Sequence, residues 1–418
     1  MESRSLVVGV DLGVEYTQIC VKREGQEPES ICISPGNDRF LIPTALCIRN
    51  DTKDWLFGED AIRCRNREAG WFLSDLLGKV TRQETVTIYD MEFTGAMLLE
   101  RFIRKVLSAL KQRYIQDTIE RVAVTVQELN DNLEAAIYQS LETVGIRRDR
   151  ATVQNHLLSF MYYAVSQPKE LWAADVSLFD FRPEGMFYCQ LSASRRTAPV
   201  AISAQTADLS DLMDYEMLET MSDKQLAYTF RTITDKVISR QILSAVYVTG
   251  SGFEGTWCDG VLRELCTARR VFKGQNLYVK GAAYAAAAPN EPKLQDFLFL
   301  TEDMLRATVS IRMFRDNRIS DYPLVAAGTK WNEVNAKTVG ILDDTDEVFF
   351  TVLNAVRKET KHVVMNLRNL HRRENKTTRV SVGIRCIDRD TAVITVKDLG
   401  FGQFYPNSYR IWEKVITL

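Results

Sequence analysis

Histidine is rare in this sequence, with three residues among 418. A metal centre or a nucleophilic site that depends on several imidazoles is therefore disfavoured. The eight cysteines are scattered, and no two of them are spaced as C-x-x-C. This spacing favours neither a disulfide framework nor a zinc knuckle, and we expect reduced thiols.

Long apolar runs and an excess of charge of one sign are also missing. The nearest candidate for a membrane span, residues 281–289, falls far short of the ~20 apolar residues that a bilayer requires. Lysine and arginine number 53 against 55 for aspartate and glutamate, so the composition gives no reason to expect nucleic-acid binding. The N-terminal residues show no signal-peptide pattern. We expect a soluble, cytoplasmic protein without a membrane span.

The sequence does contain a series of strand and helix patterns that occurs twice in the first 290 residues. Alternating residues up to about residue 50 predict a β-meander, and helical spacing predicts a helix over 92–114. A buried strand over 121–126 is followed by a helix that Asn130 or Asp131 caps and that ends at Gly145. The second series comprises strands at 176–181 and 186–194, a helix at 222–242 and a strand at 244–249. This order indicates α/β organisation with an internal duplication.

Beyond about residue 290 the character of the chain changes. A proline-containing break at 288–295 precedes the short apolar segment Asp296–Leu300. The stretches that follow alternate as strands do, and helical spacing is missing from them. We therefore predict an all-β domain of about 115 residues at the C-terminal end, after a linker.

The stretch Val7–Gly25 carries the most specific chemical signal. An apolar run ends in Asp11, a turn follows at Gly13, and alternation resumes from Tyr16. A carboxylate at the end of a buried strand, followed by a glycine, can hold a hydrated Mg²⁺ while backbone N–H groups meet phosphate oxygens. The alternative is a turn aspartate that caps backbone amides. Glu15 lies in the turn itself, where its charge would repel a phosphate by ~1–4 kcal/mol.

Five segments resemble, in the same order, motifs of the seventy-kilodalton heat-shock chaperones, a family within the actin-like ATPase superfamily. They are the first phosphate turn in GVDLGVEYTQICV, the segment LIPTALCIRNDTKDWLFGEDA, the strand in VAVTVQELND, the adenosine-binding turn in VYVTGSG and the helix in YVKGAAYAAA. The apolar DFLFL is similar to the interdomain linker of these chaperones, and SDYPLVAAGTKWNEV resembles the start of their peptide-binding β-sandwich. The resemblance extends over nearly the whole chain.

This resemblance implies an α/β fold, namely an actin-like, two-lobed nucleotide-binding domain with duplicated ribonuclease-H-like cores over residues 1–294. A linker over 295–303 and an all-β sandwich over 304–418, without the helical lid of the family, would follow. The implied ligands are ATP or ADP with Mg²⁺, and the implied partner is a peptide or protein client on the C-terminal domain. The implied nucleotide-binding residues are Asp11, Gly13, Val14, Glu15, Tyr16, Asp180, Gly250, Ser251, Gly252 and Phe253, with Asp11 and Asp180 facing the metal.

The glycines at 250 and 252 would allow close backbone approach, and Phe253 would stack on an adenine. The competing interpretation is that the glycines only allow the strand-to-helix turn to form and do not contact a ligand. For Asp180 the alternative is a strand-end aspartate in a polar turn.

The second phosphate turn departs from the family pattern. Arg182, Pro183 and Glu184 stand where the family has consecutive glycines, and Phe187 stands at its second carboxylate position. A phosphate cradle needs free N–H groups and close backbone approach, which Pro183 cannot supply. Arg182 can still reach a phosphate through its guanidinium, although most arginines in turns are only solvated.

Two further catalytic positions of the family are changed. Its lysine position holds Ser74, and its hinge glutamate position corresponds to Asn155 or His156. We interpret His156, together with Cys20 and Cys189, as a core-side residue and not as a ligand or nucleophile.

These observations lead to a main hypothesis and two rivals. The main hypothesis is a degenerate, chaperone-like protein whose nucleotide binding is weak or lost, whose ATP turnover is very slow or absent, and whose β-domain binds a peptide or protein. The first rival is an active, nucleotide-gated chaperone ATPase with catalytic groups at unexpected positions, such as Lys79. The second, a sugar or acid kinase of the same superfamily, fits the linker and the β-domain poorly.

Overall fold

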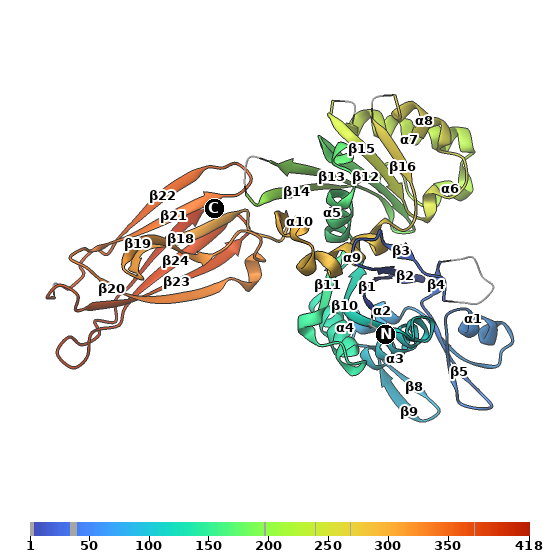
Figure 1. The fold of residues 1–418 in the computed structure, drawn as a ribbon, viewed down its shortest axis with the longest axis horizontal. Coiled ribbons are helices and arrows are strands. Elements are labelled where there is room, and N and C mark those ends of the chain that lie inside the picture. The colour runs from blue at the N-terminus through green and yellow to red at the C-terminus, as the bar shows by residue number, and fades with distance from the viewer. Residues whose placement is uncertain (1–3, 34–39, 196–197, 239, 268, 372) are drawn as a thin grey trace. The chain divides into compact units, whose positions relative to one another are not determined.

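The structure is a computed structural model that describes residues 4–33, 40–195, 198–238, 240–267, 269–371 and 373–418 (Figure 1). Two compact units make up the chain: Met1–Tyr188 with Ala207–Gln295, and Cys189–Thr206 with Asp296–Leu418. Within the described ranges, no helix has both the length and the apolar character that a membrane span requires.

The first unit contains a sheet with two helices packed on one face. Its elements are β1 (Arg4–Leu12), β2 (Tyr16–Lys22), β3 (Glu29–Ser30), β4 (Ile42–Pro43), α3 (Gly95–Arg113), β10 (Asp117–Val126), α4 (Asp131–Thr143) and β11 (Ala151–Asn155). The sheet runs in the order β11-β10-β1-β2-β3, with β4 beside β2. Strand β1 pairs in parallel with β10 and antiparallel with β2. Phe102 of α3 and Ile137 of α4 are fully buried against this sheet.

A second group of strands has a similar arrangement and belongs to the same unit, except for the residues of its last strand from Cys189 onward. The elements are β12 (Asp175–Arg182), β13 (Gly185–Ser194), α6 (Met217–Thr220), α7 (Asp223–Ile238), β15 (Leu243–Thr249), α8 (Asp259–Leu265) and β16 (Arg270–Lys273). The order is β16-β15-β12-β13, and β15 pairs in parallel with both β12 and β16. Helices α7 and α8 cover one face (Figure 1). This order repeats the order β11-β10-β1-β2 of the first sheet.

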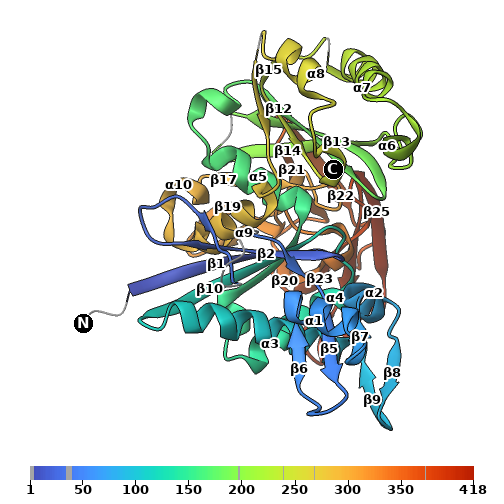
Figure 2. The same cartoon turned by 90° about the vertical axis from the view of Figure 1, so that its right-hand side faces the viewer.

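Two helices, α5 (His156–Ser166) and α9 (Leu277–Ala287), lie between these two groups of strands (Figure 2). Phe160 of α5 contacts Tyr247 of β15, with ring centroids 5.8 Å apart. Helix α9 lies close to β1, because a Cβ atom added at Gly9 would be 2.4 Å from the carbonyl oxygen of Val279. Glycine is therefore required where the helix crosses the strand.

Smaller elements surround the first sheet. They are β5 (Leu46–Arg49), β6 (Trp55–Phe57), α1 (Gly58–Asn66), β7 (Gly70–Leu73), α2 (Leu76–Thr81), β8 (Thr85–Ile88), β9 (Met91–Thr94) and, later in the chain, α10 (Pro292–Gln295). Strands β6-β5-β7 form a three-stranded sheet, and β8 and β9 form a hairpin.

The second unit includes a short parallel strand pair. Strands β14 (Val200–Asp208) and β17 (Phe297–Leu300) pair so that Val200 is opposite Phe297. The segment predicted as an apolar linker thus contributes strand β17, whose main chain forms hydrogen bonds with β14.

Two four-stranded antiparallel sheets form the rest of the second unit. Their strands are β18 (Ala307–Arg315), β19 (Arg318–Val325), β20 (Asn335–Leu342), β21 (Glu347–Asn354), β22 (Thr360–Asn366), β23 (Thr378–Asp388), β24 (Thr391–Asp398) and β25 (Ile411–Thr417). The orders are β19-β18-β21-β22 and β20-β23-β24-β25. Alternate side chains of both sheets, such as Phe350 and Ile394, share one buried core, so the two sheets form a sandwich.

A buried ion pair lies at the end of β24. The Arg373 guanidinium donates to both carboxylate oxygens of Asp398, at 2.9 and 2.7 Å, and both side chains are at most 3% exposed. Asp398 also accepts from the Ser408 hydroxyl at 2.6 Å and from the Gly400 N–H at 2.9 Å. Through Asp398, these bonds connect the segment before β23, which contains Arg373, with the segment after β24, which contains Gly400 and Ser408.

Most of the predicted elements are confirmed, and the chain is a mixed α/β protein with several sheets. Thr94 accepts from the Met97 N–H at the start of α3, and Asn130 accepts from the Leu133 N–H at the start of α4. Of the two predicted caps of α4, Asn130 is thus the correct one. The β-type stretches after residue 300 are strands.

Candidate functional site

Two carboxylates occupy equivalent places near the ends of two strands. Asp11 lies near the end of β1 and Asp180 near the end of β12, each strand being the first of its group. Both side chains are buried, with 8% and 6% of the residue surface exposed. The two aspartates are near enough for the charge of Asp11 to act on the pKa of the Asp180 carboxyl.

Asp11 is covered by His156, the first residue of α5. The imidazole Nε2 lies 2.8 Å from Asp11 Oδ1, and since a carboxylate only accepts, Nε2 carries the hydrogen. The His156 ring stacks on Tyr278 of α9, with centroids 3.9 Å apart and an interplanar angle of 13°. Its other nitrogen, Nδ1, is buried and has no hydrogen-bond partner within the described residues.

Asp180 is covered from two sides. The Tyr278 hydroxyl donates to Asp180 Oδ2 at 2.8 Å, and the Arg182 guanidinium donates to the same oxygen at 3.4 Å. Arg182 also lies over the Phe187 ring, 4.2 Å from its centroid. We call Asp11, His156, Tyr278, Asp180 and Arg182 the carboxylate cluster.

The environment of Asp180 disfavours its ionised form. Burial raises the pKa of this carboxyl above its ordinary value, and the nearby charge of Asp11 acts in the same direction. The Arg182 charge, the His156 ring and the Tyr278 hydrogen bond lower the pKa but do not outweigh burial. A carboxyl that resists ionisation is a weak ligand for a divalent cation.

The first predicted phosphate turn is closed by its own backbone. The Gly13 N–H donates to the Tyr16 carbonyl at 3.1 Å, and the Thr44 N–H donates to the Glu15 carbonyl at 2.8 Å. Val14 and Tyr16 have about half of their surface exposed, at 45% and 48%. The Gly13 amide is therefore engaged within the protein.

The glycine turn after β15 is likewise engaged. Gln275 accepts from the Gly250 N–H at 3.0 Å and donates to the Gly250 carbonyl at 2.8 Å. Gly250 has a φ of 96°, and a Cβ atom at Gly252 would lie 2.4 Å from the Phe181 ring. These glycines allow close packing of the backbone. This role corresponds to the structural interpretation of the turn, which the sequence analysis gave as the alternative to nucleotide binding.

Phe253 does not offer a face to a base. Its side chain is fully buried and stacks on Trp257, with centroids 5.7 Å apart and an interplanar angle of 12°. Phe181 and Phe230 meet the same ring edge-on. The Phe253 ring is thus part of the aromatic core beneath α7 and α8.

An open cavity of about 1200 Å³ lies next to the first turn. It is lined by the predicted residues Val14, Glu15, Tyr16 and Ser251, and by Ser74. Four carboxylates line it (Glu15, Glu59, Asp75 and Glu254) against one cation, Arg65. A nucleotide phosphate chain would therefore meet net negative charge, at ~1–4 kcal/mol for each unit-charge pair 4 Å apart. Asp11 and Asp180 are absent from this lining.

The substituted family positions have local structural roles. Asn155 caps α5, accepting from the Leu158 N–H at 2.9 Å, whereas its neighbour His156 enters the carboxylate cluster. Lys79, the alternative catalytic lysine, forms an ion pair with Glu84 at 3.0 Å. Pro183 and Glu184 form the two-residue turn between β12 and β13.

Sequence reasoning missed Tyr278 and Gln275, and interpreted His156 as a simple core residue. Tyr278 lies in the YVKGAAYAAA segment, where it is one of two tyrosines among mostly small residues, and this composition was an available signal. Gln275 stands three residues earlier, without a sequence signal of its own.

The residues present fit a Mg²⁺–nucleotide complex poorly. One carboxylate is bonded by an imidazole, the other by a phenol and a guanidinium, and the turn amides are engaged. Across the described part of the chain, no group of three or more His, Cys, Asp and Glu side chains is placed to hold a metal ion.

Comparison with known families gives two matches. The family described as "Family of unknown function (DUF5716) C-terminal" matches residues 27–302, which is more than half of the chain. A "Domain of unknown function (DUF8552)" matches residues 304–418. None of the curated proteins compared with the chain matches it.

Proposed function

The chain belongs to the family of unknown function DUF5716 C-terminal, and we propose that it is a degenerate, heat-shock-chaperone-like binding protein. In this proposal nucleotide binding is weak or lost, and the C-terminal β-sandwich binds a peptide or protein partner. ATP turnover is very slow or absent, so the protein acts as a binding module or scaffold.

The carboxylate cluster is the observation that carries this proposal. A nucleotide site of the kind that the sequence resembles would need Asp11 and Asp180 to face hydrated Mg²⁺ and phosphate. Here His156 bonds to Asp11 at 2.8 Å and Tyr278 bonds to Asp180 at 2.8 Å. Exchanging these partners for a metal would require exposing both buried carboxylates and separating the stacked rings.

The arrangement of strands supports an actin-like, two-lobed nucleotide-binding fold as the origin of the first unit. The orders β11-β10-β1-β2 and β16-β15-β12-β13 match position by position, with β1 and β12 as the first strand of each group. Helices lie on both faces of each group. A duplicated α/β core with one aspartate near the end of each first strand is what the resemblance leads us to expect.

The active-ATPase alternative is less well supported. Charge stabilisation around a γ-phosphate supplies most of the rate in such hydrolysis, and losing one such contact typically costs ~10²–10³-fold. Lys79 is paired with Glu84 and is absent from the cavity lining. The family lysine position is the uncharged Ser74.

Calorimetric titration of the full chain with Mg²⁺-ATP and Mg²⁺-ADP tests the proposal. We expect no saturable heat at micromolar nucleotide, together with no phosphate release above buffer at saturating Mg²⁺-ATP. The matched control is Asp11→Asn, which removes the charge of the residue best placed for a metal. Tight binding or turnover that Asp11→Asn abolishes would contradict the proposal and restore the active-ATPase alternative.

A further inference from the structure

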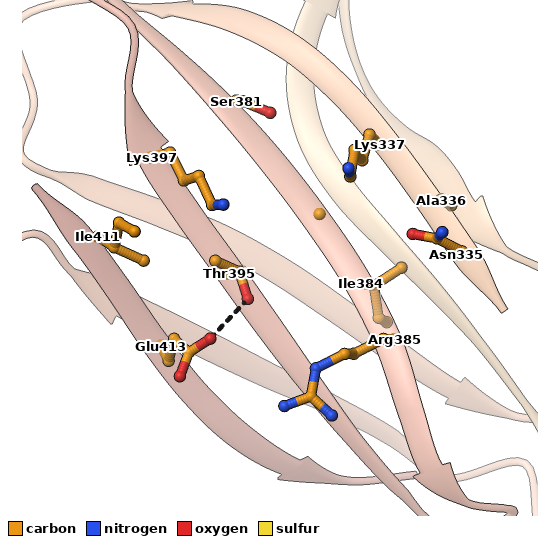
Figure 3. A pocket seen from close by; sticks show the side chains of 11 residues that line it. Asn335, Ala336, Lys337, Ser381, Ile384, Arg385, Thr395, Lys397, Ile411 and Glu413 are labelled. Atoms are coloured by element: carbon orange, nitrogen blue, oxygen red, sulfur yellow. Dashed lines mark hydrogen bonds between the residues drawn. The ribbon is translucent and has the colours of Figure 1, made fainter. Parts of the chain in front are cut away.

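The outward face of the β20-β23-β24-β25 sheet carries a groove of about 350 Å³ (Figure 3). Strand register places Lys337, Gly383, Thr395 and Glu413 side by side across the four strands. Because Gly383 has no side chain, the middle of this row is a depression between Lys337 and Thr395. We call this depression and its lining the basic groove.

Three cations surround the basic groove. Lys337 comes from β20, Arg385 from β23 and Lys397 from β24 (Figure 3). None of the three has an ion-pair partner among the described residues. The single carboxylate of the lining, Glu413, accepts a hydrogen bond from Thr395 at 3.2 Å. The groove therefore has uncompensated positive charge.

Exposed apolar side chains accompany these cations. Ile411 stands opposite Lys397 on β25, and Val339 stands opposite Ser381 on β20, with 55% of the surface of each exposed. Val415, at 63% exposed, extends the same face. A face that carries both cations and exposed β-branched side chains complements an extended segment that presents carboxylates and apolar side chains on one of its faces.

We propose that the basic groove binds an extended acidic segment of a partner protein, its carboxylates on Lys337, Arg385 and Lys397 and its apolar side chains on Ile411 and Val339. The proposal rests on the proposed role of the β-sandwich in partner binding and assigns that role to one face and one chemistry. Strands lie ~4.8 Å apart, so the four-strand face is ~14 Å wide across the strands. About four extended residues of a bound segment would cross this width.

A nucleic acid is a poorer occupant of this groove. Single-stranded nucleic acids are held by aromatic platforms along a continuous positive track. The lining contains no aromatic side chain within the described residues, and Glu413 interrupts the positive charge.

Fluorescence anisotropy of the full chain with three labelled ten-residue probes tests the proposal. The probes alternate pairs of leucines with pairs of glutamates, of glutamines or of lysines, so that each face of the extended probe carries both residue types. We expect the glutamate probe to bind at least about tenfold more tightly than the glutamine probe and the lysine probe not to bind. The advantage of the glutamate probe should shrink between 50 and 500 mM salt, because exposed charges are screened.

Two kinds of variant locate the binding. Lys337→Glu with Lys397→Glu reverses the charge, and Gly383→Val fills the depression without changing charge. A Cβ atom at Gly383 would meet no atom closer than 3.5 Å, and the nearest atom belongs to the flexible side chain of Lys337. Each variant should weaken binding of the glutamate probe at least about tenfold. The control Lys361→Glu with Arg312→Glu, an equal charge change on β22 and β18 of the other sheet, should leave binding unchanged.

The outcomes separate this inference from the proposed function. Binding of the glutamine probe that neither groove variant affects would overturn the basic groove and leave the partner-binding function standing. Absence of binding for all three probes, with variants and wild type equally folded by circular dichroism, would overturn both. Tighter binding of a single-stranded oligonucleotide that Lys337→Glu with Lys397→Glu abolishes would overturn the acidic-peptide assignment.

Discussion

Asp180 and Asp398 are both buried aspartates, yet their surroundings move their pKa values in opposite directions. For Asp398, burial alone would raise the pKa, but bonds from Arg373, from Ser408 and from backbone amides together hold it well below its usual range. For Asp180, one phenol and a guanidinium at 3.4 Å do not outweigh burial. The number and geometry of the donors decide in which direction the pKa of each aspartate moves.

At this scale we predict that Asp398→Asn destabilises the β-sandwich by about 3–5 kcal/mol, because it leaves the Arg373 guanidinium buried without its counter-charge. Hydrogen exchange of residues 378–398 in the full chain measures the loss. The control is Asp343→Asn, whose carboxylate forms an exposed pair with Lys376 at 3.6 Å and should cost at most about 1 kcal/mol. Equal effects of the two substitutions would contradict the prediction.

The same aspartate predicts how sandwich stability depends on pH. Its pKa in the folded chain is below the unfolded value of about 3.9, so the stabilisation is fully present above that value. It is lost as pH falls below about 3.9 towards the folded pKa. Unfolding followed between pH 5 and pH 2 should show this loss in the wild type and a flatter profile in Asp398→Asn. Parallel profiles would show that Asp398 is not the group responsible.

Among the elements, α9 shows how glycines set a helix position. Gly9 of β1 lies beneath the helix, and Gly281 of α9 lies against α5, where a Cβ atom would be 1.9 Å from the Ser159 carbonyl oxygen. These contacts bring α5 and α9 together, and with them His156 and Tyr278, which stack at 3.9 Å. The carboxylate cluster therefore depends on the close packing of two helices.

We predict that Gly9→Ala destabilises the first unit by about 1–3 kcal/mol or more, because the added methyl group would overlap the backbone of α9. Urea unfolding monitored by far-UV circular dichroism measures the change. Gly260→Ala in α8 is the matched control, since nothing lies within 4 Å of its Cβ position and alanine favours a helix by about 0.5–1 kcal/mol. A loss of stability in the control, or none in Gly9→Ala, would contradict this account of α9.

For the whole molecule, the β-sandwich has a core of its own. Every buried member of that core lies between Leu305 and Leu418. The second family match, residues 304–418, has nearly the same limits. A hydrophobic core that draws on one continuous segment is the usual mark of an independently folding domain.

We accordingly predict that residues 304–418 fold when produced alone. The fragment loses no core residue, but it loses several contacts with residues before 304. These are the bond from Ser194 to the Val356 carbonyl, the contact of Leu298 with Gly328, and the bonds from the Met304 and Trp331 N–H groups and from Arg389 to carbonyls of residues 301–303. Its amide hydrogen exchange should match that of the same residues in the full chain, apart from these places. Uniform loss of protection would show that the sandwich requires the rest of its unit.

Local sequence determined most of the elements, because their signals lie within a few residues. The apolar spacing and the caps at Thr94 and Asn130 set α3 and α4, and alternation set the strands of the sandwich. The positions of Asp11 and Asp180 near strand ends were equally readable. The sequence predicts a linker at Phe297–Leu300, because the strand that pairs with it, β14, lies 97 residues earlier in the chain.

Only the tertiary structure decided what surrounds those residues. His156 meets Asp11 across 145 positions of the chain, and Tyr278 meets Asp180 across 98. Gly383 becomes the floor of a groove only because strand register sets it beside Lys337 and Thr395. Helix and strand signals are local, whereas the partners of a buried carboxylate depend on how distant elements pack. The sequence by itself therefore determined where the carboxylates are, and the packing of α5 and α9 decided that side chains of the protein cover them.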